Sequence, residues 1–138
     1  GPRGIMELAV RYKGEQDGFS FAKDGYVRAD NTDNDLYFYV LDGKDYLASP
    51  NQLGFLRTTR FRLLPFRGDY DEVTAELAKM SSLPGEDRVA VTPGDWVQVM
   101  TQDKTFALLR VGGVSGEGPG RRLALWYAYS PAVGAPVF

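Results

Sequence analysis

Apolar and polar residues alternate along most of the chain with a period of two, which is the pattern of half-buried β-strands. The alternating runs are short, and glycine, proline, asparagine and aspartate separate them, as is typical of turns. The sequence therefore predicts a mainly β protein, a β-sandwich or open barrel of about nine short strands. Eleven segments have an extended pattern, from which about nine strands are expected: residues 7–13, 18–23, 25–29, 35–41, 46–48, 53–56, 58–64, 87–92, 95–101, 104–111 and 121–129.

Side-chain alternation also assigns faces within the predicted strands. The segment 7–13 places Leu8, Val10 and Tyr12 on one face. The segment 35–41 is apolar on both faces, which predicts a central strand. In 121–129, four residues share a face that excludes Trp126, namely Leu123, Leu125, Tyr127 and Tyr129. The pattern alone leaves open which of these two faces is buried.

One segment departs from the period of two and predicts a short helix over 70–81. Its apolar residues Tyr70, Val73, Leu77 and Met80 recur at intervals of three and four, which places them on one helical face. Acidic residues at 69, 71 and 72 suit the amino end of a helix dipole. Pro84-Gly85 prevents the helix from continuing.

The 138 residues fit a single domain. Residues 1–5 look like a vector-derived remnant or a disordered tail, because Met6 follows Gly1-Pro2-Arg3-Gly4-Ile5. We therefore expect a β-rich domain over 6–130 and a surface tail over 131–138. No apolar run is long enough for a membrane-spanning helix.

The amino-acid composition excludes several classes of catalytic and metal-binding site. The chain has no histidine and no cysteine, so serine–histidine–aspartate and cysteine–histidine catalysis are excluded, as are the commonest ligands of transition metals. Nucleic-acid binding needs a basic excess, whereas the net charge here is −2. We therefore predict a noncatalytic protein with no cofactor, no catalytic residue and no nucleic-acid partner.

One acidic loop resembles a calcium-binding loop. Asn31, Asp33 and Asp35 supply oxygen atoms at alternating positions, of the kind that calcium prefers, and Asp42 stands at the twelfth position of the loop. Leu36 stands where such a loop needs glycine. The favoured interpretation is that these side chains form turn hydrogen bonds before a strand, and calcium is the alternative.

Aromatic residues are the candidates for ligand binding. Flat rings stack on sugars and dominate protein interfaces. If such rings form an exposed strip, the candidate residues are Trp96, Trp126, Tyr127 and Tyr129.

Several short motifs between about residues 18 and 111 are similar to a group of small β modules in bacterial secreted or surface proteins. They are Gly18-Phe19-Ser20-Phe21, Asp35-Leu36-Tyr37-Phe38, Tyr46-Leu47-Ala48, and Thr92-Pro93-Gly94-Asp95-Trp96-Val97 followed by 105–111. This resemblance implies an extracytoplasmic or secreted module. It carries over no catalytic residue.

These observations favour a noncatalytic binding or protein-interaction module of a bacterial envelope or secreted protein, with a protein or glycan partner. Two alternatives stay open. The first is a structural subunit of a phage, secretion or surface-layer assembly, in which an apolar edge strand drives self-association into homo-oligomers. The second is a carboxylate-dependent enzyme with a deep pocket. The sequence also leaves a cytoplasmic location open.

Overall fold

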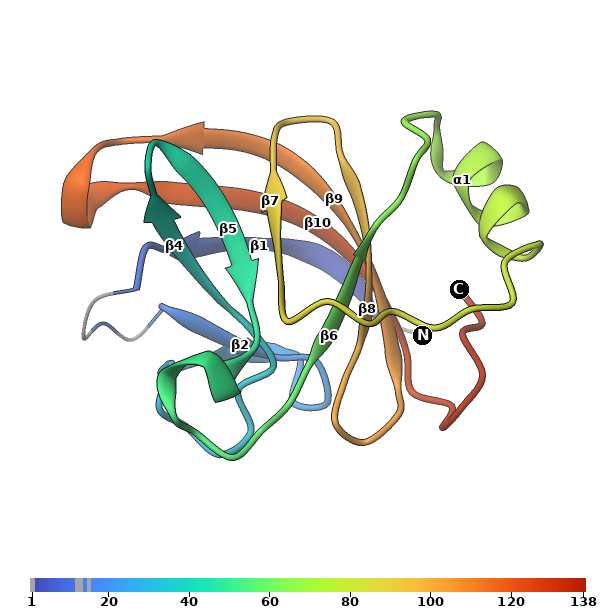
Figure 1. Cartoon of the computed structure of the whole chain (residues 1–138), viewed down its shortest axis with the longest axis horizontal. Coiled ribbons are helices and arrows are strands. Elements are labelled where there is room, and N and C mark those ends of the chain that lie inside the picture. Colours follow the sequence, from blue (N-terminus) through green and yellow to red (C-terminus); the bar gives the residue numbers. More distant parts are fainter. Residues whose placement is uncertain (1, 12–13, 15) are drawn as a thin grey trace.

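The computed structural model describes residues 2–11, 14 and 16–138, and in these residues it confirms a mainly β protein with a single α-helix (Figure 1). The elements, in chain order, are β1 (Arg3–Ala9), β2 (Gly18–Ser20), β3 (Gly25–Val27), β4 (Tyr37–Leu41), β5 (Lys44–Ala48), η1 (Pro50–Leu53), β6 (Arg60–Leu63), α1 (Tyr70–Leu77), β7 (Arg88–Val91), β8 (Trp96–Met100), β9 (Phe106–Ser115), η2 (Gly118–Gly120) and β10 (Arg122–Ser130).

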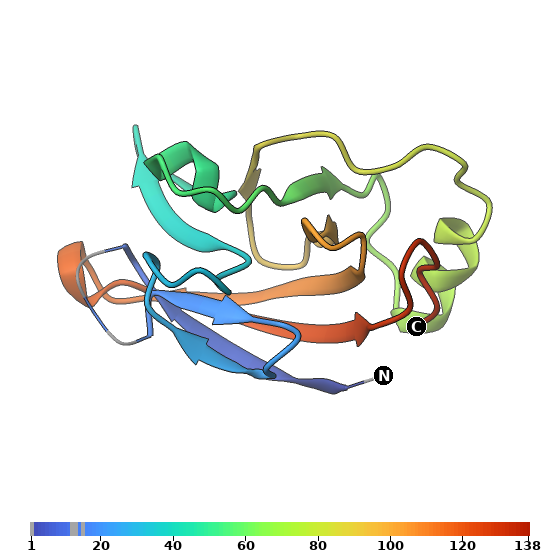
Figure 2. The same cartoon turned by 90° about the horizontal axis from the view of Figure 1, so that it is seen from below.

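The strands form three antiparallel sheets. The largest has the order β1-β10-β9-β8-β6, the second β4-β5-β7, and the third is the β2-β3 hairpin. The three-stranded sheet lies over one face of the five-stranded sheet (Figure 2). Isolated bridges from Val10 to Phe38 and from Phe61 to Glu86 link the two layers at both sides, but the described strands do not close into a barrel.

The main core fills the space between these layers. Alternation along β10 sends Leu123, Leu125, Tyr127 and Tyr129 inward, so the tyrosine face of this strand is the buried one. Phe19, Phe21, Phe38 and Phe61 pack against it from the opposite side. The rings of Phe21 and Tyr129 stack at 5.8 Å between centroids. Burial of these large side chains supplies the main hydrophobic stabilisation of the fold.

A second, smaller core lies on the opposite face of the five-stranded sheet, where α1 covers Trp96 and Leu108 with Val73 and Leu77. The helix begins with a capping box, because Asp69 accepts a hydrogen bond from the Glu72 N–H and the Glu72 side chain accepts one from the Asp69 N–H. The helix is shorter than predicted. It ends at Leu77 because the amides of Lys79 and Met80 bond three residues back in a tighter turn.

The ends of several predicted strands differ from the structure. Arg3, Gly4 and Ile5 are the first residues of β1 and pair with β10, so they are not a disordered tail. The strand ends at Ala9 rather than at 13, and Gly1, Tyr12 and Lys13 lie outside the described residues. The predicted strand at 53–56 is absent, because Pro50 starts the turn η1 and Gly54 ends it with φ +84°.

Two further segments, the end of β9 and the tail after β10, are fixed by contacts with distant residues. β9 extends to Ser115, four residues beyond the prediction, because Ser115 pairs with Arg122 of β10. The tail after β10 contacts the body of the protein at two points. The Gly134 N–H donates to Lys104 O at 2.7 Å, and Phe138 packs against the second core.

Candidate functional site

The four aromatic candidates do not form one exposed strip. Tyr127 and Tyr129 are 5% and 6% exposed and belong to the main core, and Trp96 is 2% exposed beneath α1. Their polar atoms have partners inside the protein, since Tyr129 contacts the Thr105 hydroxyl and the Trp96 indole N–H donates to Gly68 O at 2.9 Å. Trp126 alone of the four is half-buried. The prediction of an exposed strip is therefore wrong, because the two tyrosines face the main core between the sheets and α1 covers Trp96 on the outer face.

Trp126 stands in a row of side chains that crosses the outer face of the five-stranded sheet. Ile5 of β1 pairs with Trp126, Trp126 with Arg110, and Arg110 with Trp96. With neighbouring strands ~4.8 Å apart, this row spans about 14 Å. Tyr70 of α1 packs edge-on against Trp126 at 5.6 Å between ring centroids. The helix therefore covers the row at Trp96 and leaves it open toward Ile5.

A hollow of about 480 Å³ lies beside this row, and we call it the Trp126 groove. Its lining residues are Ile5, Gly94, Arg110, Val111, Gly112, Ala124, Leu125 and Trp126. The hollow exists because the residues next to Trp126 and Arg110 along β10 and β9 are small. A Cβ atom at Gly112 would lie 3.2 Å from Ala124 O, so the floor is backbone and methyl group.

The two polar side chains of the Trp126 groove form no hydrogen bond with another described residue. The Arg110 guanidinium lies 5.6 Å from the centre of the Trp96 ring and makes no ion pair or hydrogen bond with another described residue. The Trp126 indole N–H likewise has no hydrogen-bond partner in the described part of the chain. By contrast, Arg67, whose Nη2 lies beside Gly94, already donates to Pro93 O and lies 3.7 Å from Asp95.

The calcium candidates do not come together. Asn31 accepts a hydrogen bond from the Asp33 N–H at 2.8 Å, which is the favoured turn interpretation, and Asp33 pairs with Lys23 at 2.7 Å. Asp42 lies in the β4–β5 turn, so the extended strand β4 separates it from Asp35. Among the described residues no three acidic side chains approach closely enough to hold a metal ion.

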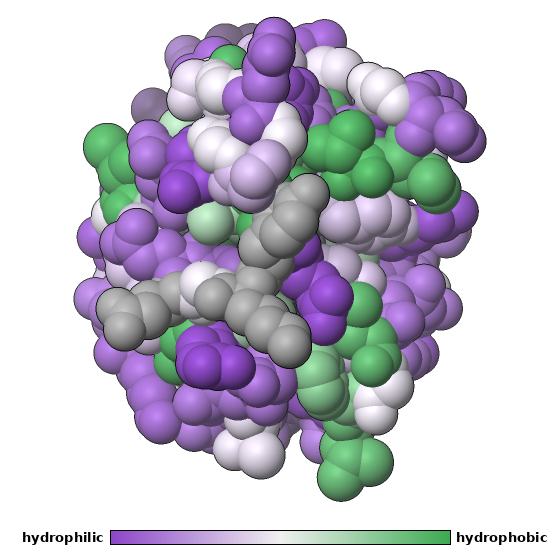
Figure 3. All heavy atoms as spheres, turned by 90° about the vertical axis from the view of Figure 1, so that its left-hand side faces the viewer, coloured by the Kyte–Doolittle hydropathy of each residue, from purple (hydrophilic) through white to green (hydrophobic). Residues whose placement is uncertain are grey.

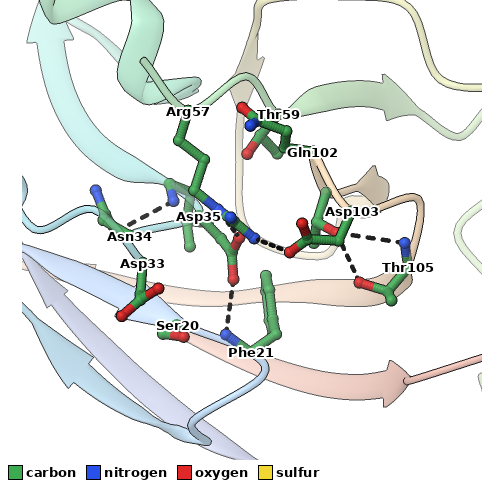
Figure 4. Close-up of polar contacts among 12 residues, drawn as sticks. Ser20, Phe21, Asp33, Asn34, Asp35, Arg57, Thr59, Gln102, Asp103 and Thr105 are labelled. Atoms are coloured by element: carbon green, nitrogen blue, oxygen red, sulfur yellow. Dashed lines mark hydrogen bonds and ion pairs between the residues drawn. The ribbon is translucent and has the colours of Figure 1, made fainter. Parts of the chain in front are cut away.

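Asp35 instead anchors a buried polar network (Figure 4). Its carboxylate is 1% exposed and accepts hydrogen bonds at 2.8 Å from the Phe21 N–H and from Arg57 Nε. Arg57 also reaches Asp103 at 2.7 Å. Burial raises the pKa of Asp35, while Phe21 and Arg57 oppose that shift. The network joins three loops that are far apart in the sequence.

Sequence reasoning missed this network because Arg57 and Asp103 lie 22 and 68 residues beyond Asp35. The one available signal was the position of Asp35 directly before a strand predicted to be buried. Asp35 is 1% exposed and is not among the lining residues of the Trp126 groove. Its carboxylate is therefore placed to hold loops together rather than to meet a substrate.

A second cleft, of about 440 Å³, lies between the tips of the β4–β5 and β9–β10 hairpins. Arg121 lines it, but both of its donors at 2.8 Å are directed to Asp45. The surface at this end of the molecule is mainly hydrophilic, with hydrophobic residues in separate patches (Figure 3). The Trp126 groove is the better candidate, because its guanidinium, that of Arg110, has no acidic partner among the described residues and lies beside an apolar wall.

No helix in the described residues has the length and apolar character needed to cross a membrane. No protein-family model matches the chain, and no curated protein is significantly similar to it.

Proposed function

We propose that this chain is a noncatalytic protein-interaction module that uses the Trp126 groove as its binding surface. Binding hot spots in protein interfaces are enriched in tryptophan and arginine. In the groove, half-buried Trp126 and Arg110, which has no acidic partner among the described residues, stand side by side, with exposed Ile5 next to Trp126. This juxtaposition is the observation that carries the proposal.

The shape of the groove also favours a protein partner. Small-molecule sites are usually concave and bury most of the ligand surface. The Trp126 groove is open along the sheet face, and its floor consists of Gly112 and Ala124. Such a surface suits a side chain or short segment that a larger partner presents.

The setting that we propose, a bacterial cell envelope or a secreted protein, rests on the sequence motifs described above. Fractionation of cells that produce the full-length protein tests it directly. Recovery only from the cytoplasmic fraction would contradict this part of the proposal.

A displayed random-peptide library, used together with a glycan panel, tests the binding function. Ala124→Leu fills the floor of the groove without removing a buried group, and Ile5→Ser removes its exposed apolar wall. Leu56→Ser is the matched control, because Leu56 is 95% exposed in a loop outside the groove and Ile5 is 78% exposed. We expect peptide binders that Ala124→Leu and Ile5→Ser weaken and Leu56→Ser leaves unchanged. Peptides that bind both groove variants as tightly as the wild type would contradict the proposal. Binding of glycans but of no peptide would show that the partner is a glycan rather than a protein.

A second candidate function, an assembly subunit, is favoured by the free edge of β1. The backbone N–H of Tyr129 donates to Pro2 O at 2.8 Å, and the backbone N–H of Val10 donates to Arg121 O at 3.0 Å. The even-numbered residues along β1 therefore direct their backbone groups toward β10. Among the odd-numbered residues, Glu7 and Ala9 have N–H groups bonded to Tyr26 and Gln16. Beyond β10, Arg3 and Ile5 pair with no other strand of the described residues.

An unpaired edge beside an exposed isoleucine can add a strand from another copy. Light scattering over a range of protein concentrations tests this candidate, with Ile5→Lys as the edge-blocking variant and Leu56→Lys as its control. A dimer that Ile5→Lys alone dissolves supports assembly. A monomeric mass at every concentration contradicts it.

A further inference from the structure

The side chains around the Trp126 groove define the chemistry of its partner. We propose that the groove binds an acidic–apolar segment of a partner protein, in which an apolar side chain packs between Ile5 and Trp126 and an adjacent carboxylate pairs with Arg110. This inference rests on the proposed function and names the class of partner for the same site.

The apolar half of this recognition lies on the β1 side. Ile5 is 78% exposed although it pairs directly with Trp126, and the small residues Ala124 and Gly112 leave space in front of the two side chains. Apolar surface that is held open in this way gains free energy when a partner removes it from water. An apolar side chain of the partner would fill the hollow and cover Ile5.

The charged half lies two strands away, at Arg110. The guanidinium is exposed, the Trp96 ring lies 5.6 Å from it, and it has no carboxylate partner among the described residues. The neighbouring cation Arg67 is engaged with Pro93 O and Asp95. Arg110 is thus the cation at this end of the groove that a carboxylate of the partner can reach without displacing another acid.

The charges beside Ile5 are balanced. Glu7 and Arg3 lie two residues to either side of Ile5 on the exposed face of β1, and the Arg3 guanidinium already donates to the Tyr70 hydroxyl and packs over the Tyr70 ring. Arg110 attracts a carboxylate to the opposite side of the groove. Ile5 and Arg110 are separated by two strand spacings, about 10 Å, a distance that two adjacent residues of an extended segment can span with their side chains.

Two short peptides with blocked ends test the inference, one containing Phe-Leu-Glu and the other Phe-Leu-Gln between Gly-Ser flanks. Each is titrated into nitrogen-15-labelled protein, and the readout is the indole N–H resonance of Trp126, assigned by Trp126→Phe. The same titrations use Arg110→Gln and, as a charge control on the other sheet, Lys44→Gln. Both variants change exposed side chains, and a wild-type-like spectrum verifies that each is folded.

We expect the glutamate peptide to shift the Trp126 resonance and to bind about three- to fivefold more tightly than the glutamine peptide, which is the upper part of the range for an exposed ion pair. Arg110→Gln should remove that difference, and Lys44→Gln should keep it. High salt should also reduce it.

Equal binding of the two peptides at the groove, unchanged by Arg110→Gln, would overturn the inference and leave the proposed function standing. The absence of any shift with either peptide would also overturn it. The proposed function would also be contradicted only if the displayed peptide library yielded no binder that the groove variants weaken. Free 3-phenylpropanoate that binds as tightly as the glutamate peptide would replace the protein partner with a small carboxylate.

Discussion

Replacing Arg57 by methionine isolates the energetic role of the buried network. Methionine keeps the apolar stem of the arginine side chain but removes the cation that faces Asp35. The Arg57 side chain is 14% exposed and the Asp35 side chain is 1% exposed, so the variant leaves a carboxylate buried without a counter-charge. Removing one partner of such a pair costs about 3–5 kcal/mol.

We expect about 3 kcal/mol, the low end of that range, because Arg57 retains some contact with water and the Phe21 N–H still donates to Asp35 in the variant. Asp103 is the matched control, since it pairs with the same guanidinium but is 61% exposed. Asp103→Asn should cost roughly 0.2–1 kcal/mol. Urea unfolding followed by tryptophan fluorescence measures both values, because Trp96 is buried.

The loss of stability in Arg57→Met should depend on pH, and the pKa of Asp35 sets the direction of that dependence. Burial raises the pKa of Asp35 in the folded protein above 3.8, its unfolded value. The stability from such a group is fully present below the unfolded pKa and is lost as pH rises through the folded pKa. Loss of Arg57 raises the folded pKa further, so the deficit of Arg57→Met should shrink as the pH falls from neutrality toward that of the unfolded carboxyl. A deficit that is independent of pH, or equal to that of Asp103→Asn, would refute the reasoning.

The remaining predictions concern the helix cap and two buried tyrosines. Asp69→Ala removes the capping box and should destabilise the protein by ~1 kcal/mol, whereas Asp71→Ala, in the same turn but without the cap contact, should cost less; urea unfolding compares them, and equal losses would contradict the capping role. Burial raises the pKa of both Tyr37 and Tyr127 to about 12. Because their folded pKa lies above that of an unfolded tyrosine, the stability they contribute is full below pH 10 and is lost toward about pH 12. Ultraviolet titration should therefore show Tyr37 and Tyr127 ionising late, and ionisation of all eight tyrosines near pH 10 would contradict their burial.

Local patterns predicted the elements of the fold well, because the period of an element is a property of neighbouring residues. The alternation in β10 grouped Leu123, Leu125, Tyr127 and Tyr129 correctly, and the spacing of Val73 and Leu77 identified the buried face of α1. The helix end was wrong by four residues, since the tighter turn at Lys79 depends on backbone contacts that no apolar spacing reveals.

The candidate site could be predicted only in part, because it depends on pairing between distant strands. Trp126 was among the residues identified, but its exposure depends on α1, which buries Trp96 on the same sheet face. Arg110 and Ile5 were missed, because the register of β1, β10 and β9 is what places them beside Trp126. The importance of the small residues Gly112 and Ala124 is also visible only in the structure, where they form the floor of the groove beside Trp126 and Arg110.

The most direct test of the central claim is the effect of a selected peptide binder on the two indole N–H resonances, before and after Ala124→Leu. If the Trp126 groove is the binding surface, the Trp126 resonance shifts more than that of Trp96, whose N–H donates to Gly68, and Ala124→Leu abolishes the shift. A binder that leaves the Trp126 resonance unmoved, or that binds Ala124→Leu as tightly as the wild type, would show that recognition takes place elsewhere on the protein.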